Sequence, residues 1–287
     1  MSNILSPMAR ARRFVSRELE KARTLARPLK KLPVAGAWLT RLNRHLTLPD
    51  KLEPVQITGG IADGLVMELF ASSRSTFSSG GVEPDVSAAL ERYAAAGMVV
   101  YDLGANMGYF ALSMARRVGP DGRVFAFEPD PEMAGRLERN ARMNGFGNVT
   151  LVRAAVWNEE GWVTFNRSDP SISPDRGLGH IVTEGEQEGD KISVPTVTLD
   201  RFSVSAPAPD LIKCDVEGAE VEVFQGARSL LERVHPVIVC EMHAPEKEAH
   251  LLDLFRSLGY SCSRLDGNHL LADPHGRHGP GGSPHVA

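Results

Sequence analysis

The residues best suited to chemistry in this chain stand in one short run, from Asp102 to Gly108. Gly104 removes the side chain where backbone must approach a ligand closely, and Asn106 tolerates a left-handed conformation almost as glycine does. Gly108 lets the helix that follows pack against the preceding strand. Amide groups at a helix start favour a negative ligand group, and the carboxylate of Asp102 suits an ammonium group. The run therefore predicts a site for a ligand that carries both charges, such as a methionine moiety.

A second carboxylate, Glu128, ends the next apolar run, residues 125–127. An acidic side chain in this place accepts both hydrogen bonds of a ribose diol. The alternative for Glu128 is a cap for the helix that begins near Pro131, but Asp130 is better placed for that cap. Proteins that bind NAD also combine a glycine turn with a later acid, but their pattern is G-x-G-x-x-G, and here Asn106 interrupts it. The spacing favours S-adenosylmethionine (SAM) over NAD.

The elements that must position these residues follow from the hydrophobic pattern. From residue 98 onward, short apolar runs alternate with helical patterns, which predicts a mostly parallel sheet with helices on both faces. The turn at residues 266–268 joins the last two strands, so one strand of this closing hairpin is expected to be antiparallel. The predicted strands are 98–103, 124–127, 149–152, 211–214, 237–242, 260–264 and 269–272, and the predicted helices are 109–118, 131–143, 219–225, 229–234 and 247–258.

The remaining segments predict a domain organisation around this α/β core. We expect a helical extension over residues 1–50, a β-hairpin and linker over 51–82, the main domain over 83–273 and a disordered tail over 274–287. Apolar and polar residues alternate over residues 54–70, which predicts a hairpin. The Ser and Gly content of residues 72–81 predicts a loop, and Pro84 opens a predicted helix over residues 84–95. Residues 168–190 are expected to form a mobile loop between strands 162–165 and 192–197. The tail carries His275, His278 and His285, for which metal binding is a weaker alternative.

Five segments of the chain, taken in order, resemble the FkbM-type methyltransferases. They are Asp102–Phe110, Phe127–Pro131, Thr196–Asp200, Ile212–Glu220 and Val239–His243, and the resemblance covers about residues 83–273. It implies a Rossmann-like class I methyltransferase fold, with seven strands of which the last hairpin strand is antiparallel. It also implies SAM-dependent methylation of hydroxyl groups on small molecules, sugars and secondary metabolites.

The resemblance carries a cofactor site onto matching positions of this chain. Glu128 would bind the ribose, and Ala155, after the third strand, would lie near the adenine. Asp215 also counts among the expected cofactor-binding residues. The methionine end would be lined by Asp102, Gly104, Ala105, Asn106 and Gly108.

Candidate catalytic residues follow the fourth and fifth strands of the predicted sheet. In a doubly wound sheet, ligands bind beyond the carboxyl ends of the strands, so Asp215, Glu217, Glu241 and His243 should line one cleft. His243 has the pKa best matched to removing a hydroxyl proton at neutral pH. Its alternative is a histidine bonded to backbone in the loop before Pro245, and the two interpretations are evenly balanced.

Other polar residues near this cleft receive structural interpretations. Glu220 and Glu222 are expected to face a solvated helix surface, Lys213 to form an internal salt bridge, and Asp200 to start a helix. The acidic cluster could also hold Mg²⁺, which prefers oxygen ligands. The spacing specifies no metal geometry, so Mg²⁺ is an alternative that we do not favour, and no metal ligand is assigned.

Charge is unevenly spread along the 287 residues. Residues 1–50 carry 11 Lys/Arg and three Asp/Glu, against 21 and 33 in the rest of the chain. Residues 4–29 have the pattern of a basic amphipathic helix, which predicts contact with its own domain or a partner subunit, or alternatively with an anionic membrane surface. Nucleic acid is not expected as a partner, because the acidic body would repel phosphates.

The composition predicts a cytoplasmic protein, attached to a membrane only if the basic helix does so. No apolar run approaches the length of a membrane span, and no secretory signal is evident. Three cysteines without metal-ligand spacing fit free thiols in a reducing compartment.

Two alternatives to O-methylation of a small hydroxylated molecule, such as a sugar, a glycoside or a polyketide-type metabolite, remain open in the sequence. One is a SAM-binding scaffold without turnover, and the other is a peripheral membrane methyltransferase acting on a lipid or glycolipid. The acceptor, the position methylated and the oligomeric state are not specified by any motif.

Overall fold

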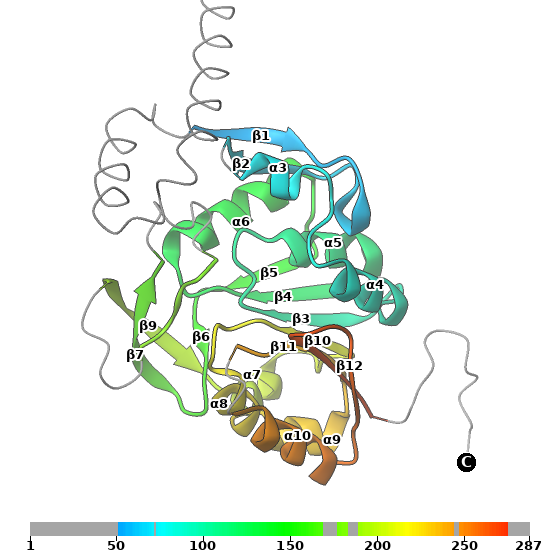
Figure 1. Cartoon of the computed structure of the whole chain (residues 1–287), viewed down its shortest axis with the longest axis vertical. Coiled ribbons are helices and arrows are strands. Elements are labelled where there is room, and N and C mark those ends of the chain that lie inside the picture. Colours follow the sequence, from blue (N-terminus) through cyan, green and yellow to red (C-terminus); the bar gives the residue numbers. More distant parts are fainter. Residues whose placement is uncertain (1–50, 72, 169–176, 183–188, 244–246, 275–287) are drawn as a thin grey trace, which may run out of the picture. The chain divides into compact units, whose positions relative to one another are not determined.

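The chain divides at residue 50 into two units, and the computed structural model describes the second (Figure 1). The described residues are 51–71, 73–168, 177–182, 189–243 and 247–274. The predicted basic helix over residues 4–29 and the predicted tail beyond residue 274 lie outside them. Within these ranges, none of the helices combines the length and the apolar character needed to cross a membrane.

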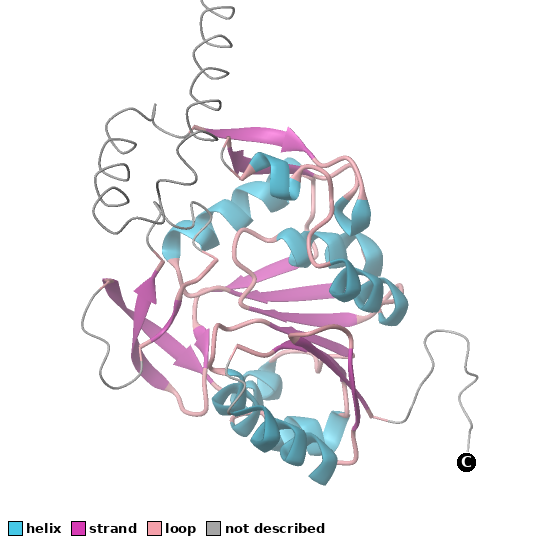
Figure 2. Ribbon diagram, in the orientation of Figure 1, coloured by secondary structure: helices cyan, strands magenta, loops and turns pink. Residues whose placement is uncertain are grey.

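A seven-stranded sheet forms the centre of the described unit, with the order β12-β13-β11-β10-β3-β4-β5 (Figure 2). The pairs from β5 to β11 are parallel, whereas β13 runs antiparallel to both of its neighbours. The mostly parallel sheet and the single antiparallel strand of the closing hairpin are thus both confirmed. The strands are β3 (Val99–Leu103), β4 (Arg123–Phe127), β5 (Val149–Val152), β10 (Leu211–Cys214), β11 (Val237–Glu241), β12 (Ser261–Arg264) and β13 (His269–Asp273).

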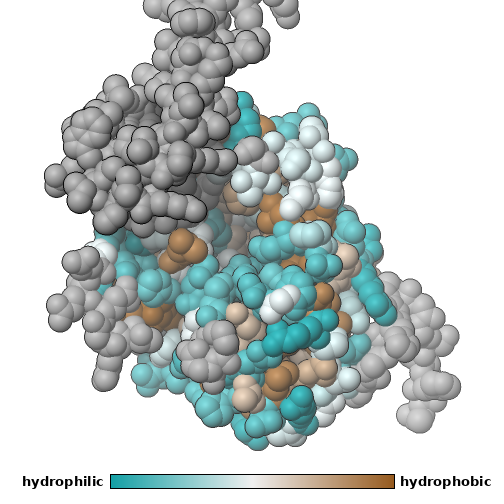
Figure 3. Space-filling model, in the orientation of Figure 1, coloured by the Kyte–Doolittle hydropathy of each residue, from teal (hydrophilic) through white to brown (hydrophobic). Residues whose placement is uncertain are grey.

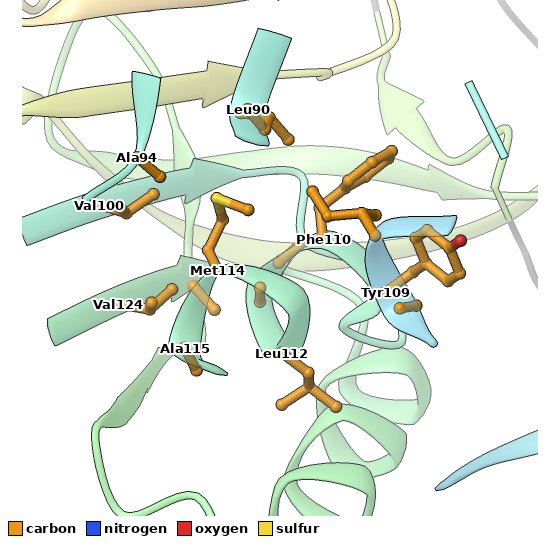
Figure 4. Packing of buried hydrophobic residues seen from close by; sticks show 14 of the residues in the cluster. Leu90, Ala94, Val100, Tyr109, Phe110, Leu112, Met114, Ala115 and Val124 are labelled. Carbon is orange, nitrogen blue, oxygen red and sulfur yellow. The ribbon is translucent and has the colours of Figure 1, made fainter. Parts of the chain in front are cut away.

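Helices cover both faces of this sheet, because its strands carry apolar side chains on both sides. Val100 points into one buried cluster and its neighbour Tyr101 into the other. Figure 4 shows the first cluster, in which Val100 and Val124 of the sheet meet Met114 of the covering helix. Its helices are α4 (Pro84–Tyr93), α5 (Tyr109–Val118) and α6 (Pro131–Met143); the opposite face carries α7 (Leu199–Ser205), α8 (Glu220–Gln225), α9 (Arg228–Val234) and α10 (Glu248–Ser257).

Two acidic residues fix helix starts as the sequence predicts. Asp130 caps α6, since its carboxylate accepts from the backbone N–H groups of Glu132 and Met133 at 2.7 and 3.2 Å. Asp200 lies in the first turn of α7, and its carboxylate accepts the N–H of Leu230 at the start of α9. The cap by Asp130 leaves Glu128 free of that structural duty.

The predicted hairpin is formed by β1 (Leu52–Gln56) and β2 (Val66–Phe70), with a 3-10 turn at Gly60–Ala62 between them. It is tied to α6, because the side-chain oxygens of Asn140 and Asn144 accept backbone N–H groups of β2 at 2.8 and 2.9 Å. The predicted loop 72–81 is wrong in part, since α3 (Arg74–Phe77) lies within it. A four-residue helix is too short to give a periodic hydrophobic signal.

A second, four-stranded sheet was not expected as a separate layer. Its order is β6-β9-β7-β8, and it is built from β6 (Ala155–Val156), β7 (Gly161–Arg167), β8 (His180–Ile181) and β9 (Asp190–Val197). The predicted strands 162–165 and 192–197 pair antiparallel within it. The predicted loop 168–190 is wrong where β8 pairs with β7, and residues 169–176 and 183–188 lie outside the described part. A two-residue strand such as β8 is too short to show an alternation of apolar and polar residues in the sequence.

Apolar side chains reach the face in Figure 3 only as small separate patches. The large hydrophobic side chains that are exposed among the described residues are Met143, Trp162, Leu178 and Val204. Scattered exposure of this kind is normal for a globular surface. Leu178 differs from the others because it also lines the large cavity described next.

Candidate active site

The turn after β3 adopts the left-handed backbone that its residue types predict. Gly104, Asn106 and Gly108 have φ values of +77°, +49° and +93°. A Cβ atom on Gly104 would lie 1.8 Å from the carbonyl oxygen of Asp215, so this glycine admits the backbone that follows β10. The side chain at Gly108 would meet Leu137 of α6 rather than the preceding strand, which corrects the reason given for this glycine.

Glu128 closes the turn from the neighbouring strand end. Its two carboxylate oxygens accept the backbone N–H groups of Asn106 at 2.8 Å and Asp130 at 2.7 Å, and its side chain is buried. Burial raises the pKa of Glu128 to about 8, against the lowering effect of these two hydrogen bonds. The carboxylate therefore joins the turn to the end of β4, and Glu128 also lines the large cavity of the molecule.

Asp102 is the least satisfied polar side chain of the site. It is 1% exposed, and neither carboxylate oxygen accepts a hydrogen bond of good geometry among the described residues, although the backbone N–H of Ala111 is near enough to lower its pKa. Burial raises the pKa of Asp102 to about 6, while the nearby charge of Lys213 opposes that shift. Burial of a carboxylate that is not fully hydrogen-bonded lowers the stability of the fold. A cationic ligand group beside Asp102 would pair with the carboxylate and offset that loss.

One cavity of about 1010 Å³ runs past this turn and continues to the ends of β10 and β11. Most of the residues expected at the cofactor site line it, including Ala105 and Ala155, although Gly108 does not. Its far wall comes from two segments in which no site residue was predicted. One is the end of the predicted linker and the first residue of the main domain, and the other lies around β8 in the predicted mobile loop. They contribute Ser73, Thr76, Phe77, Gly81, Val82 and Glu83, and Gly177, Leu178, Gly179 and Ile181.

The four predicted catalytic residues meet at this second end of the cavity. The Nε2 atom of His243 lies 3.3 Å from Glu217, 3.4 Å from Glu241 and 3.8 Å from Asp215. Its Nδ1 atom is 2.9 Å from a carboxylate oxygen of Glu220. His243 is thus held by side chains, and the alternative of a backbone-bonded histidine has no contact to support it among the described residues.

Glu220 corrects one expectation directly. It was predicted to lie on a solvated helix surface, yet its side chain is 0% exposed, and it accepts the N–H of Gly218 as well as contacting His243. The reason is that α8 begins at Glu220 and its first turn faces inward to β11, where His243 follows. Glu222, in the same helix, is 22% exposed and pairs with Lys247 at 2.7 Å.

Charge within the cluster decides which groups hold protons. Burial lowers the pKa of His243, but the bond to Glu220 and the carboxylates around Nε2 outweigh it and raise the pKa to about 9. Burial raises the pKa of Glu217 to about 7, although His243 opposes the shift. At neutral pH the histidine therefore carries a proton, and Glu217 is the group poised to exchange one.

Lys213 forms the internal salt bridge that the sequence predicts. Its Nζ atom lies 3.0 Å from Asp215 and 4.9 Å from the ring centre of Phe110. Burial lowers the pKa of Lys213, but Asp215 and Asp102 outweigh it and raise the pKa; for Asp215, burial raises the pKa, and Lys213 and His243 together lower it. Lys213 thus interacts both with Asp102 at the turn and with Asp215 in the carboxylate cluster.

His269 is a second buried histidine that sequence reasoning missed. Its Nδ1 atom contacts Asp266 at 2.8 Å, and its Nε2 atom lies 3.5 Å from Glu241 and 3.6 Å from Glu83. Burial lowers the pKa of His269, but these three carboxylates outweigh it and raise the pKa to about 10. One feature of the sequence could have indicated it. His269 is the first residue of the last strand of the closing hairpin, and this strand pairs His269 with Glu241.

Comparison with known proteins identifies the family. The model of the FkbM methyltransferase domain matches residues 102–262, so the chain belongs to this family. The sheet order and the helices on both faces are those of Rossmann-like class I methyltransferases.

Two characterised relatives and one solved structure show the range of similarity. The hexuronic acid methyltransferase AglP of Haloferax volcanii is 33% identical over 164 residues, 56% of this chain and 63% of that protein. The 2-O-methyltransferase NoeI of Sinorhizobium fredii is 32% identical over 150 residues, 47% of this chain and 59% of that protein. The chain thus spans less than two thirds of the length of these relatives. The FkbM methyltransferase structure from Methylobacillus flagellatus is 18% identical, with a TM-score of 0.43 over 61% of this chain and 43% of that one.

Proposed function

We propose that the protein is a SAM-dependent O-methyltransferase that acts on a hydroxyl group of a small molecule, most simply a sugar or glycoside. The observation that carries this proposal is the shared cavity. It joins the buried carboxylate of Asp102 at one end to the cluster around Glu217 and His243 at the other. The names of two relatives, a hexuronic acid methyltransferase and a 2-O-methyltransferase, support a sugar-type acceptor.

The residues around the turn fit SAM. Asp102 would receive the ammonium group, and the amide groups at the start of α5 would receive the carboxylate of the methionine end. Glu128 would accept from the ribose hydroxyls, and Ala155 would border the adenine. When bound, SAM supplies an electrophilic methyl group on a sulfonium. Asp215 belongs to the cluster around His243, and its salt bridge with Lys213, which pairs with Asp102 in the sheet, would connect the two ends of the cavity.

At the acceptor end, we assign Glu217 the role of the base. Its carboxylate would take the proton of the acceptor hydroxyl, because its pKa of about 7 leaves it ionised in part at neutral pH. His243 would hold its own proton, 3.3 Å from Glu217, and stabilise the ionised carboxylate. Glu241 and Asp215 would keep His243 charged, and Glu220 would orient its ring.

Two further expectations belong to the proposal. Mg²⁺ between Asp215, Glu217, Glu241 and His243 stays an alternative that we do not favour, because Mg²⁺ prefers oxygen ligands alone. Contact of residues 4–29 with a subunit or membrane, and a cytoplasmic location, stay predictions.

The test is transfer of a labelled methyl group from SAM to a panel of sugars, glycosides and polyketide-type alcohols. Incorporation into an acceptor should be lost in Glu217→Gln while binding of S-adenosylhomocysteine is kept. Glu222→Gln is the matched control, because Glu222 lies outside the cavity lining and pairs with Lys247. Labelled product on an amine or a carbon instead of a hydroxyl would contradict the O-methyltransferase assignment.

A further inference from the structure

We propose that Glu83, Glu241 and His269 bind a first-row divalent cation, such as Mn²⁺, at the acceptor end of the cavity. The three residues can each bring one ligand atom to a common point, since these atoms all lie within 4.8 Å of one another. Binding of the cation is independent of the enzyme's activity. Only its role toward the acceptor rests on the proposed function.

The Nε2 atom of His269 is the observation that points to a ligand. The side chain is 8% exposed, yet Nε2 has no hydrogen-bond partner among the described residues. Its nearest carboxylate oxygens are Oε2 of Glu241 at 3.5 Å and Oε2 of Glu83 at 3.6 Å. These separations exceed the usual donor–acceptor distance of N–H···O hydrogen bonds in proteins, which is about 2.7–3.2 Å. The Oε2 atom of Glu83 is also buried and without a hydrogen bond.

The same separations suit ligand atoms around one ion. Nitrogen and oxygen ligands bind first-row cations at about 2.0–2.2 Å, which places neighbouring ligand atoms roughly 3.0–3.5 Å apart. The distances from Nε2 of His269 to the two carboxylates need to shorten by only a few tenths of an ångström. The carboxylate oxygens of Glu83 and Glu241 lie within 4.8 Å of each other, so the two side chains would also have to rotate toward each other around an ion.

The opposite side of the imidazole ring is already fixed. Asp266 accepts from Nδ1 of His269 at 2.8 Å, and its Oδ1 atom also accepts the backbone N–H groups of Asn268 and His269. A histidine that ligates a metal through one nitrogen commonly donates the other N–H to a carboxylate, which sets the tautomer and the ring orientation. Asp266 therefore leaves Nε2 as the nitrogen that faces Glu83 and Glu241. Without a metal this nitrogen carries a proton, which the cation would displace into solvent, so Mn²⁺ should bind more tightly as the pH rises.

The mixture of donors selects the class of ion. Two carboxylates and one imidazole suit Mn²⁺ or Zn²⁺ better than Mg²⁺, which prefers oxygen ligands alone. The cavity side of the site is open, because Glu83 and Glu241 both line the cavity and His269 lies behind them. An ion held there would have vacant positions toward the acceptor, which an acceptor oxygen could fill.

Glu241 would couple the ion to the proposed proton-transfer cluster. Its Oε2 atom faces His269 at 3.5 Å, and its Oε1 atom faces His243 at 3.4 Å. One carboxylate would thus serve the ion with one oxygen and the charged histidine with the other. An acceptor with two neighbouring hydroxyl groups, as in a sugar, could bind the ion through one and present the other to Glu217.

The test is Mn²⁺ binding to the full chain, stripped with a chelator and titrated while the EPR signal of free Mn²⁺ is recorded. Wild type should bind one Mn²⁺ tightly. His269→Asn and Glu83→Gln should each weaken binding at least about tenfold, and Asp266→Asn by about 10–100-fold, as expected for loss of a supporting carboxylate. Glu222→Gln is the matched control, since it removes a carboxylate outside the cavity lining and should leave Mn²⁺ affinity unchanged.

Three results would overturn the site. Wild type without a stoichiometric Mn²⁺ site would show that His269 is a charged histidine among carboxylates and no ligand. Binding lost in His243→Asn but kept in His269→Asn would place the ion in the other cluster. Binding lost only when His275, His278 and His285 are all replaced by Asn would assign it to the tail. Circular dichroism checks that each variant is folded. Mn²⁺ binding without any binding of S-adenosylhomocysteine would refute the proposed function and leave this site standing.

Discussion

The two ends of the cavity are built in different ways. The turn end comes from residues close in the chain, between Asp102 and Glu128, and backbone N–H groups join them directly. The acceptor end gathers Glu83, Glu217, Glu220, His243 and His269 from segments far apart, and side-chain contacts hold them. A local motif keeps its geometry wherever the strand, turn and helix form. A dispersed cluster depends on the whole sheet, so its chemistry can change without loss of the fold.

The largest effect on ligand binding is expected at Gly104, where the turn leaves no room for a side chain. A side chain at Gly104 would collide with the carbonyl of Asp215, and its φ of +77° adds strain. Gly104→Val should abolish binding of S-adenosylhomocysteine in isothermal titration and lower the melting temperature. Gly97→Ala is the matched control, because φ is +82° and no atom lies within 4 Å of the added Cβ. It should cost about 1–2 kcal/mol of stability and keep binding. Equal losses in both variants would show that backbone strain, not the close approach, matters at Gly104.

The next largest effect separates binding from turnover at the acceptor end. Glu217→Gln should lower kcat by about 10²–10⁴-fold, the usual contribution of a positioned base. Affinity for S-adenosylhomocysteine should stay within about twofold of wild type, since no contact of the turn changes. A variant that keeps its kcat while His243→Asn loses it would transfer the role of base to the histidine.

The fold was largely readable from the sequence, and the site only in part. The strands β3, β4 and β10 are mostly apolar runs, and the cap by Asp130 is a local signal, so both were predicted. The carboxylate of Glu220 was misjudged because a six-residue helix, α8, gives little periodicity to show which face is buried. His269 reaches the site through the order of strands in the sheet, and Glu83 through the packing of α4 against β11, neither of which a local pattern encodes. In the small sheet, the long strands β7 and β9 were predicted, but β6 and β8 were missed because two residues are too few to show an alternation of apolar and polar side chains.

A moderate loss of affinity for SAM is expected when the carboxylate of Asp102 is replaced. Asp102→Asn should weaken SAM about 10–100-fold, because a charge-assisted hydrogen bond to the ammonium group is lost in a buried place. The pKa of Asp102 is raised to about 6, so protonation below that pH removes the charge that the ammonium group needs. Wild-type affinity should therefore rise between pH 5 and pH 7, and the variant should be flat over that interval. A wild-type profile that is equally flat would contradict the assigned partner of Asp102.

The smallest expected effect is a slope in stability that belongs to Glu128. Its pKa in the folded protein is raised to about 8, above its ordinary 4.5, so the folded state binds the proton more tightly than the unfolded state. The stability from this group is fully present below about pH 4.5 and is lost as pH rises through about 8. Denaturant melts of Glu128→Gln should show a shallower fall over this interval, by on the order of a few kcal/mol or less. An unchanged slope would mean that Glu128 stays ionised in the folded protein.

The central claim is that the turn around Asp102 binds SAM. Titration of the wild-type chain with S-adenosylhomocysteine in a calorimeter tests it most directly, without any knowledge of the acceptor. The account predicts saturable binding of one ligand per chain at micromolar concentration. Heat no greater than dilution at millimolar ligand, with the protein folded, would contradict it.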